Sequence, residues 1–457
     1  MNDIMKLLNI LDTDIDILSV SLSGTTKTVV LEKRLAVHEC PDCGMRMYSR
    51  GVKTRTASHP ILQDGYTILL KVRQRRWQCS NPQCKRNISD HFSFLAKSRR
   101  LTNATDLMVV NAFKDYSRTA ADVARQFSIS DHQALDIFDR YVQLRRLPLP
   151  EILCVDEVYL DMDPYCKYVL VLQDFKTGET VDLVKSRRKS QTEDYFLGIP
   201  ESERNSVKYV ISDMYNPYIN YCNVYFKNAV PIVDSFHVTQ WLIRKLDNYL
   251  RQLLKKYKAR DLERFYSVPE EKRKQINVPL SDEVYLLQNH RWVLLRNQKN
   301  IDYSAEPKKN FHYGRVLSTQ ALEELFFALD PDLRALRDLK EDFVAFNSKH
   351  FDDPEEAAKE LDLLIEKYED CGYSIFNDFA ITLKKHRSPI INSFTYASRI
   401  KESGEFYESR LSNGPMESLN RKAKDLKRNG RGYSNFDHLR NRFLFSTRLN
   451  PPLNGRK

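Results

Sequence analysis

Five apolar runs between residues 152 and 234 constrain the fold of this 457-residue chain more than any other feature. They cover residues 152–161, 168–172, 179–184, 207–213 and 229–234. Short turns separate the first three runs, and Lys176-Thr-Gly178 is typical of a hairpin. A helical pattern near residues 192–197 separates the third run from the fourth. The order predicts three antiparallel strands followed by two strands that alternate with helices.

This order, β-β-β-α-β-α-β-α, is that of a ribonuclease H-like core if a short helix fills residues 215–225. The last helix of the series is expected to begin near Phe236. The tyrosines of residues 215–225 suggest a tyrosine nucleophile, but no evident Arg/His set accompanies them. We therefore interpret these rings as packing residues.

Two of the predicted strands carry a carboxylate at a position where burial of its charge would cost free energy. Asp156 lies in the middle of the first strand and Asp213 at the C-terminal tip of the fourth. An unpaired buried carboxylate is unfavourable, and open α/β sheets place their chemistry at the carboxyl ends of strands. Glu157 should face the side opposite to Asp156, and Asp161 lies toward the end of the strand. Together with Asp163 and Asp174, both could compete for the role of Asp156.

A third carboxylate, Glu417, lies near the start of a predicted helix that Ser412 or Asn413 can cap. Pro415 suits the first turn of that helix. Helical spacing puts Glu417 on one face with Asn420, Arg421, Lys424 and Arg428. Alternatively, Glu417 is an N-terminal glutamate favoured by the helix dipole and paired with Arg421.

Three carboxylates can together hold two divalent cations about 3.5–4 Å apart, which activate an attacking oxygen and stabilise a leaving one. Hard oxygen ligands favour Mg²⁺, with Mn²⁺ as a substitute. Asp156 would bridge both ions, and Asp213 and Glu417 would each complete one. From Asp156 to Asp213 is 57 positions, but from Asp213 to Glu417 is 204. The longer gap predicts an inserted domain, and its helical patterns predict that the insertion is α-helical.

Eight cysteines are present, and four of them form two close pairs. Cys40 and Cys43 make a CxxC turn followed by Gly44, and Cys79 and Cys84 make a wider second turn. A predicted strand over residues 66–77 joins the pairs. Four thiolates on two turns predict one closed, structural zinc site. The joining strand carries four basic residues that are candidate DNA contacts: Lys71, Arg73, Arg75 and Arg76. Alternatively, they only solubilise the surface.

A helix-turn-helix is predicted within residues 119–142. Thr119 should cap the first helix, the turn covers residues 128–130, and Ser130 should cap the second helix. The second helix would then enter a major groove. The alternative is an ordinary helical hairpin.

Positive charge is concentrated in two segments. Residues 33–100 hold 15 Lys/Arg and 4 Asp/Glu, and residues 420–457 hold 11 and 2, whereas the whole chain carries a formal charge of +11. Two dense basic segments on an otherwise acidic chain favour binding to a phosphate backbone. No apolar run is long enough to span a membrane, and residues 1–23 lack the pattern of a secretory signal. We expect a cytoplasmic, nucleoid-associated protein.

These motifs resemble those of the DDE transposases of bacterial insertion sequences, and most closely the ISL-three family. The resemblance covers essentially the whole chain. Besides the four cysteines, the helix-turn-helix and the three acidic segments, it includes Asp234-Ser-Phe-His237-Val, Arg291-Trp-Val-Leu-Leu295, Gly432-Tyr-Ser-Asn-Phe436 and Leu439-Arg-Asn-Arg442. The resemblance implies that Asp156, Asp213 and Glu417 form the catalytic triad.

The resulting expectation is a multidomain α/β protein. The zinc ribbon occupies residues 1–98 and the helix-turn-helix domain 99–150. The ribonuclease H-like core occupies 151–240 and 406–457, and an all-α insertion occupies 241–405. Trp292 of the insertion is either a core residue or a DNA contact.

The expected function is DNA transposition: binding of terminal inverted repeats in double-stranded DNA, two-metal-ion cleavage, and strand transfer to target DNA by a DNA-bound homodimer. Two alternatives remain open. One is a DNA-binding regulator that has lost catalysis, and the other is a Mg²⁺-dependent nuclease without strand transfer.

Overall fold

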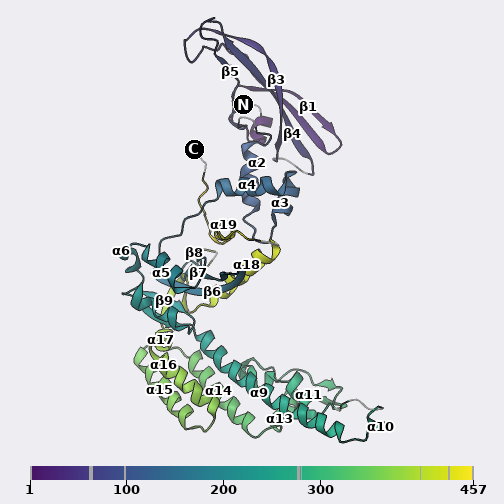
Figure 1. Ribbon diagram of the computed structural model, residues 1–457, viewed down its shortest axis with the longest axis vertical. Coiled ribbons are helices and arrows are strands. Elements are labelled where there is room, and N and C mark those ends of the chain that lie inside the picture. The colour runs from purple at the N-terminus through teal and green to yellow at the C-terminus, as the bar shows by residue number, and fades with distance from the viewer. Residues whose placement is uncertain are drawn as a thin grey trace. The chain divides into compact units, whose positions relative to one another are not determined.

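The computed structural model describes residues 3–60, 65–96, 99–274, 278, 280–401, 403–430 and 433–454 (Figure 1). The backbone separates into two compact units. The first contains residues 1–146, 160–167 and 421–457, and the second contains residues 147–159 and 168–420. Each unit is a mixture of helices and sheet, so the chain is a mixed α/β protein.

The N-terminal part of the first unit is a five-stranded sheet with the order β1-β2-β4-β3, in which β5 also pairs with β4. Strands β2 and β4 are parallel, whereas the other pairs are antiparallel. One face of the sheet is buried, with Leu31, Leu70 and Val72 fully inaccessible. The elements are α1 (Asp3–Leu7), β1 (Ile15–Ser23), β2 (Thr26–Lys33), β3 (Met47–His59), β4 (Thr67–Cys79) and β5 (Asn87–Ser89).

Three helices follow: α2 (Asn103–Ala112), α3 (Ala120–Phe127) and α4 (Asp131–Tyr141). Thr119 and Ser130 cap α3 and α4, each through a capping box, as the sequence predicts. Ser128 adopts a left-handed conformation (φ 54°) in the turn between them. Two capped helices joined by a short turn are therefore present where the sequence predicts a helix-turn-helix.

The C-terminal helix α19 (Phe436–Thr447) packs against these three helices. Leu444 and Phe445 join the helix-turn-helix core. Arg442 is buried, donates to the carbonyls of Phe113 and Arg118, and lies over the Phe113 ring. The helix-turn-helix thus shares one core with a segment about 300 residues away in the sequence.

The second unit contains a five-stranded sheet with the order β10-β9-β6-β7-β8. Strands β6, β9 and β10 run parallel to one another, and β7 and β8 are antiparallel. Every predicted strand between residues 152 and 234 is confirmed. The strands are β6 (Ile152–Asp163), β7 (Cys166–Asp174), β8 (Thr180–Val184), β9 (Tyr209–Ser212) and β10 (Val230–Val233).

Short helices occupy the connections, as predicted: α5 (Lys189–Leu197), α6 (Glu201–Arg204), α7 (Asn216–Ile219) and α8 (Tyr221–Val224). The tyrosines of residues 215–225 pack in sequence against one another, with ring centroids 5.0–5.4 Å apart. Tyr218, Tyr221 and Tyr225 belong to the core of this sheet. Their interpretation as packing residues is therefore confirmed.

Helix α9 (Ser235–Tyr266) leaves the sheet directly after β10 and opens a helical region, in which α9 contacts α14 and α16, and α14 contacts α15 (Figure 1). The core of this region is rich in Leu and Phe. The remaining helices are α10 (Glu270–Arg273), α11 (Asp282–Asn289), α12 (Trp292–Leu295), the 3₁₀ turn η1 (Gln298–Asn300), α13 (Thr319–Phe327), α14 (Asp332–Ser348), α15 (Pro354–Asp370), α16 (Ser374–Lys385) and α17 (Arg387–Asn392).

Two small hairpins also belong to the second unit: β11 (Lys308–Asn310) with β12 (Arg315–Leu317), and β13 (Tyr396–Ile400) with β14 (Phe406–Arg410). The expectation of an all-α insertion over residues 241–405 is therefore wrong, because β11, β12 and β13 lie within it. Arg410 ends β14, donates to the carbonyls of Ser393 and Asn347, and lies 3.8 Å from the centroid of the Phe394 ring. These contacts fix the chain just before α18 (Gly414–Asn429), the helix of Glu417.

Among the described residues, none of the helices combines the length and the apolar composition that crossing a membrane requires.

Candidate functional site

Three acidic residues lie at the same level of three neighbouring strands. The parallel registers of β6 with β9 and of β9 with β10, continued by one or two residues, place Asp156 beside Asp213 and Asp213 beside Asp234. The backbone N–H of Asp234 donates to the carbonyl of Ser212 at 2.8 Å, which supports this alignment. Neighbouring strands are about 4.8 Å apart, so the three carboxylates form a row at the carboxyl end of the sheet.

Asp156 and Asp213 are half-buried, and each is held by backbone. Asp156 Oδ1 accepts from the N–H of Glu157 at 2.8 Å, and Asp213 Oδ1 accepts from the N–H of Tyr215 at 2.9 Å. Burial raises the pKa of the Asp156 carboxyl to about 6, and the charge of Asp213 adds to this rise. Burial also raises the pKa of Asp213. The site therefore concentrates negative charge where the protein solvates it poorly.

Asp234 is the most buried of the three acids, with 2% of its surface exposed. Its Oδ2 lies 3.9 Å from Nε2 of His237, on the first turn of α9. Burial raises the pKa of Asp234, while the nearby His237 opposes the rise. His237 also lies close enough to Asp156 and Asp213 to lower the pKa of both. Arg187 likewise lowers the pKa of Asp213, and Arg410 that of Asp234.

Helix α18 is attached to the Asp156 strand by two amides. Asn413 donates to the carbonyl of Val155 at 3.1 Å, and Asn420 donates to Asp156 Oδ2 at 2.8 Å. Glu417 lies four residues after the first amide and three before the second, hence on the same helical face. Its side chain is exposed. The structure therefore brings the helix of Glu417, from 204 residues downstream of Asp213, onto the strand that carries Asp156.

The oxygen atoms of this cluster suit a hard divalent cation. Oδ1 of Asp234, of Asn413 and of Asn420 is buried without a hydrogen-bond partner. Carboxylate and amide oxygens are the ligand types that Mg²⁺ and Mn²⁺ prefer, so these residues fit such a cation. Among the described residues, only the four cysteines form a group of three or more ligand residues whose atoms all lie within 4.8 Å of one another. The acids are thus neighbours without forming one tight ligand shell.

Glu157 faces away from this row, as strand parity predicts. It accepts from Arg187 and, at 2.5 Å, from the hydroxyl of the buried Tyr218. The Arg187 guanidinium lies 4.1 Å from the centroid of the Tyr168 ring. Because Tyr218 belongs to α7, which follows Asp213, Glu157 connects the middle of β6, beside Asp156, with the segment that follows Asp213.

The sequence does not single out Asp234, Asn413 or Asn420 as site residues. Asp234 had a recognisable signal, since it ends an apolar strand as Asp213 does. The two amides had none, because an asparagine on a basic helix is unremarkable until the partner strand is known.

The four paired cysteines come together at the other end of the sequence. Cys40 and Cys84 have Sγ atoms 3.7 Å apart, and those of Cys43 and Cys79 are 3.4 Å apart. Tetrahedral zinc with Zn–S bonds of about 2.3 Å requires S···S separations near 3.8 Å. This cluster could therefore bind zinc, as predicted.

The two cysteine turns have matching geometry despite their different lengths. Gly44 (φ 72°) follows Cys43, and Lys85 (φ 50°) occupies the same place after Cys84. The N–H of Met45 lowers the pKa of the Cys43 thiol to about 7, whereas burial raises that of Cys79 to about 12. Backbone donors thus already favour thiolate at Cys43. Of the other cysteines, Cys154 and Cys222 are buried and Cys371 is half-buried.

The four basic residues predicted on strand β4 differ in their surroundings. Arg75 donates to Glu32 at 2.9 Å, and Arg73 lies 3.4 Å from the same carboxylate. Lys71 and Arg76 are exposed. Lys71 and Arg76 can therefore bind a DNA phosphate at a smaller free-energy cost than Arg73 and Arg75, which would have to leave Glu32.

On α18, the basic residues that the sequence predicts beside Glu417, namely Arg421, Lys424 and Arg428, are exposed. Gly432, part of the motif that follows, lies outside the described residues. In the helical region, Trp292 packs against the core and also lines a cavity of about 410 Å³ with Arg244, Arg291 and Arg296.

A family model described as a transposase matches residues 153–443. The match extends from strand β6 into α19 and includes the row of acids, the helical region and α18. No curated protein matches the chain.

Proposed function

Because the chain belongs to the ISL-three family of DDE transposases, we propose that it cuts DNA at the ends of an insertion sequence and joins them to target DNA. Asp156, Asp213 and Glu417 would hold two divalent cations, Mg²⁺ or Mn²⁺. The observation that carries this assignment is the pair of amides that attaches α18 to the Asp156 strand. It gives the distant Glu417 a reason to act with two acids of the sheet.

The reaction is a displacement at phosphorus. A water oxygen attacks a phosphodiester and the 3′ oxygen leaves, which produces a 5′ phosphate and a free 3′ hydroxyl. That 3′ hydroxyl then attacks a phosphodiester of the target, and the target's own 3′ oxygen leaves as the new P–O bond forms. Divalent cations bound here supply electrostatic stabilisation of the attacking and leaving oxygens.

The chain's own residues hold the acids in place for this reaction. The Glu157 N–H and Asn420 fix the carboxylate of Asp156, and the Tyr215 N–H fixes that of Asp213. His237, half-exposed beside the acids, is placed to donate to a phosphate oxygen.

The sheet order β10-β9-β6-β7-β8 and its strand directions support a ribonuclease H-like core, into which the helical region between α9 and α17 is inserted. The zinc-binding lobe and the helix-turn-helix would read the terminal inverted repeats. Two ends must be brought together, so we infer a homodimer on DNA.

The test is cleavage of a labelled element end by the purified full-length chain with Mg²⁺. Asp213→Asn should abolish cleavage while leaving binding of the same DNA intact. Asp194→Asn, which changes an exposed carboxylate on α5, is the matched control and should cleave normally.

Equal cleavage by Asp213→Asn and wild type would refute the assignment of Asp213. A wild-type chain that binds the end without cutting it would instead indicate a DNA-binding regulator, and one that cuts but never joins ends would indicate a nuclease.

A further inference from the structure

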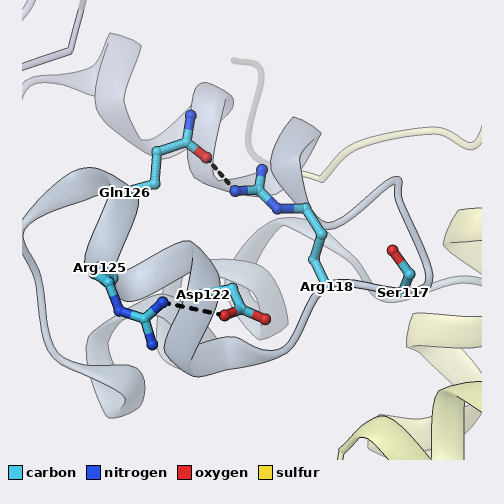
Figure 2. A pocket seen from close by; sticks show the side chains of 5 residues that line it. All are labelled: Ser117, Arg118, Asp122, Arg125 and Gln126. Atoms are coloured by element: carbon cyan, nitrogen blue, oxygen red, sulfur yellow. Dashed lines mark hydrogen bonds and ion pairs between the residues drawn. The ribbon is translucent and has the colours of Figure 1, made fainter. Parts of the chain in front are cut away.

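Two guanidinium groups flank a surface pocket beside helix α3. The pocket has a volume of about 470 Å³ and is lined by Ser117, Arg118, Asp122, Arg125 and Gln126 (Figure 2). It belongs to the helix-turn-helix, but neither guanidinium is among the basic residues that the sequence singles out.

Arg118 is held by a neutral partner. Its Nη2 donates to Oε1 of Gln126 at 2.6 Å, and Figure 2 shows the two side chains meeting end to end. Because an amide carries no charge, Arg118 keeps its full positive charge while its orientation is restricted. The carboxylates of Asp115 and Asp122 lie close enough to interact electrostatically with Arg118, but its side-chain hydrogen bond is to the amide. A guanidinium restrained in this way is well suited to bind a phosphate oxygen.

Arg125 is also available. Its side chain is 78% exposed, and its nearest carboxylate, Asp122, lies 3.5 Å away. Asp122 already accepts from the backbone N–H and the hydroxyl of Thr119 in the cap of α3. The pocket therefore presents two cations against one carboxylate that is engaged in the helix cap.

The exposed face of α4 has the opposite character. It carries Asp131, Asp136 and Asp139, and its Arg140 is paired with Asp136 at 2.6 Å. Arg140 also lies 3.6 Å from the buried Asp106. A phosphate approaching this face would meet these carboxylates and Arg140, which is already paired. Beyond the helix itself, it would meet the exposed Arg100, which lines a pocket beside α4 with Gln133, Asp136 and Arg140.

The end of helix α18 extends the positive surface of the pocket. Asn429 donates to the carbonyl of Ser117 at 3.4 Å. Arg428, one residue earlier, is 77% exposed and is paired with Asp425 at 2.8 Å. The basic C-terminal half of α18 thus ends beside the α3 pocket.

We propose that the α3 pocket binds phosphates of duplex DNA through Arg118 and Arg125, so that α3 is the helix of this domain that rests on the DNA backbone. In helix-turn-helix proteins the first helix crosses the backbone while the second lies in the groove. The charges of α3 and α4 fit that division. The proposal rests on the proposed function, because it takes duplex DNA as the ligand.

The test is binding of the full-length chain to two duplexes of equal length, one with the element's terminal repeat and one unrelated, across a series of salt concentrations. Arg118→Ala/Arg125→Ala should weaken binding to both duplexes by a similar factor, on the order of tenfold or more at moderate salt. The slope of log affinity against log salt should fall by roughly 2, since each phosphate contact contributes about 0.9.

Arg140→Ala is the matched control, because it removes a guanidinium from α4 of the same domain and should leave the salt slope unchanged. Arg118→Lys keeps the charge, so the slope should persist although the arrangement with Gln126 is lost. Thermal melting of every variant should match wild type.

An unchanged slope in a folded Arg118→Ala/Arg125→Ala protein, or an equal loss in Arg140→Ala, would overturn the proposal. The readout is binding alone. A wild-type chain that binds DNA but fails to cut it would therefore count against the catalytic assignment and leave the α3 pocket intact.

Discussion

The cysteine cluster and the acidic row are both candidate metal sites, and they are built in different ways. The four thiols come from two short turns near one end of the chain, and their sulfur atoms all lie within 4.8 Å of one another. The acids come from strand ends and from a helix separated by more than 200 residues, and they do not form such a group. A closed cluster suits a folding role, and a looser row of oxygens leaves room for a substrate.

The two sites also differ in how well the protein stabilises their ionised groups. In the cysteine cluster, backbone N–H groups favour thiolate at Cys43. In the acidic row, burial raises the pKa of Asp156 and Asp213, and three amide or carboxylate oxygens lack partners. Such groups lower the stability of the fold. Active sites often retain them because activity depends on them.

The largest expected effect is on catalysis. Asp156→Asn should reduce single-turnover cleavage by at least about 1000-fold, since it removes a carboxylate that would hold the divalent cations required for the reaction. In metal-free buffer the variant should melt at or above the wild-type temperature, because one of several neighbouring like charges is gone. Wild-type melting should rise with added Mn²⁺, and that of the variant should rise less. A variant that melts well below wild type would show that Asp156 is structural.

The second effect concerns the cysteine cluster. Cys79→Ser should lose the bound zinc and unfold the N-terminal lobe, meaning the sheet of β1 to β5. The reason is that the apparent binding free energies of structural zinc are about 10–16 kcal/mol. Elemental analysis measures the metal, and amide hydrogen exchange measures the lobe. Cys371→Ser, which changes a half-buried cysteine of the helical region, is the control and should keep one zinc per chain. Zinc retention and normal exchange in Cys79→Ser would contradict the assignment.

A smaller effect is expected at Glu157, which connects the middle of β6, beside Asp156, with the segment that follows Asp213. Glu157→Gln keeps an acceptor for Tyr218 but removes the ion pair with Arg187. Cleavage should fall by roughly tenfold through misplacement of Asp213, with DNA affinity and the Mn²⁺ melting response preserved. A loss as large as that of Asp156→Asn, together with loss of the Mn²⁺ response, would make Glu157 a ligand.

The smallest effect lies at the opposite end of β6, where Glu151 is bound by Lys176 and Lys208. These lysines lower the pKa of Glu151 to about 2. A depressed carboxyl pKa stabilises the fold above the unfolded value of about 4.5, and this contribution is lost as pH falls toward 2. The three side chains are exposed, so Glu151→Gln should cost less than about 1 kcal/mol at neutral pH. The difference in the free energy of unfolding should vanish at acid pH, and a constant difference would argue against the ion pairs.

Sequence periodicity predicts the sheet of the second unit because its strands are apolar and bounded by turns. In the N-terminal sheet it predicts only β4 and misses β1, β2, β3 and β5. The side chains of β1 and β3 are mostly exposed and show no alternation. Those strands are held by pairing within their sheet, which no local pattern records. The packing of α19 on the helix-turn-helix was equally hidden, because Leu444 and Phe445 fit any amphipathic helix.

The site shows the same division. Asp213 could be proposed from its place at a strand tip, whereas Asp156 has acidic neighbours and is selected by strand parity and the family resemblance. Glu417 rests on its basic helical face together with the resemblance, since its local sequence also fits an ordinary helix start. The sequence does not predict the amides that attach its helix to β6. The role of Asn420 depends on its hydrogen bond to Asp156 Oδ2, which only the folded structure shows.

The central claim is that Glu417 acts with Asp156 and Asp213 on a shared set of divalent cations, and a change of metal preference tests it most directly. Glu417→Cys replaces a hard oxygen by a softer sulfur ligand, which tolerates Mn²⁺ better than Mg²⁺. We predict that Glu417→Cys cleaves a labelled element end at a measurable rate with Mn²⁺ and not with Mg²⁺, whereas wild type cleaves with both. Wild-type cleavage by Glu417→Cys in Mg²⁺ would contradict the account.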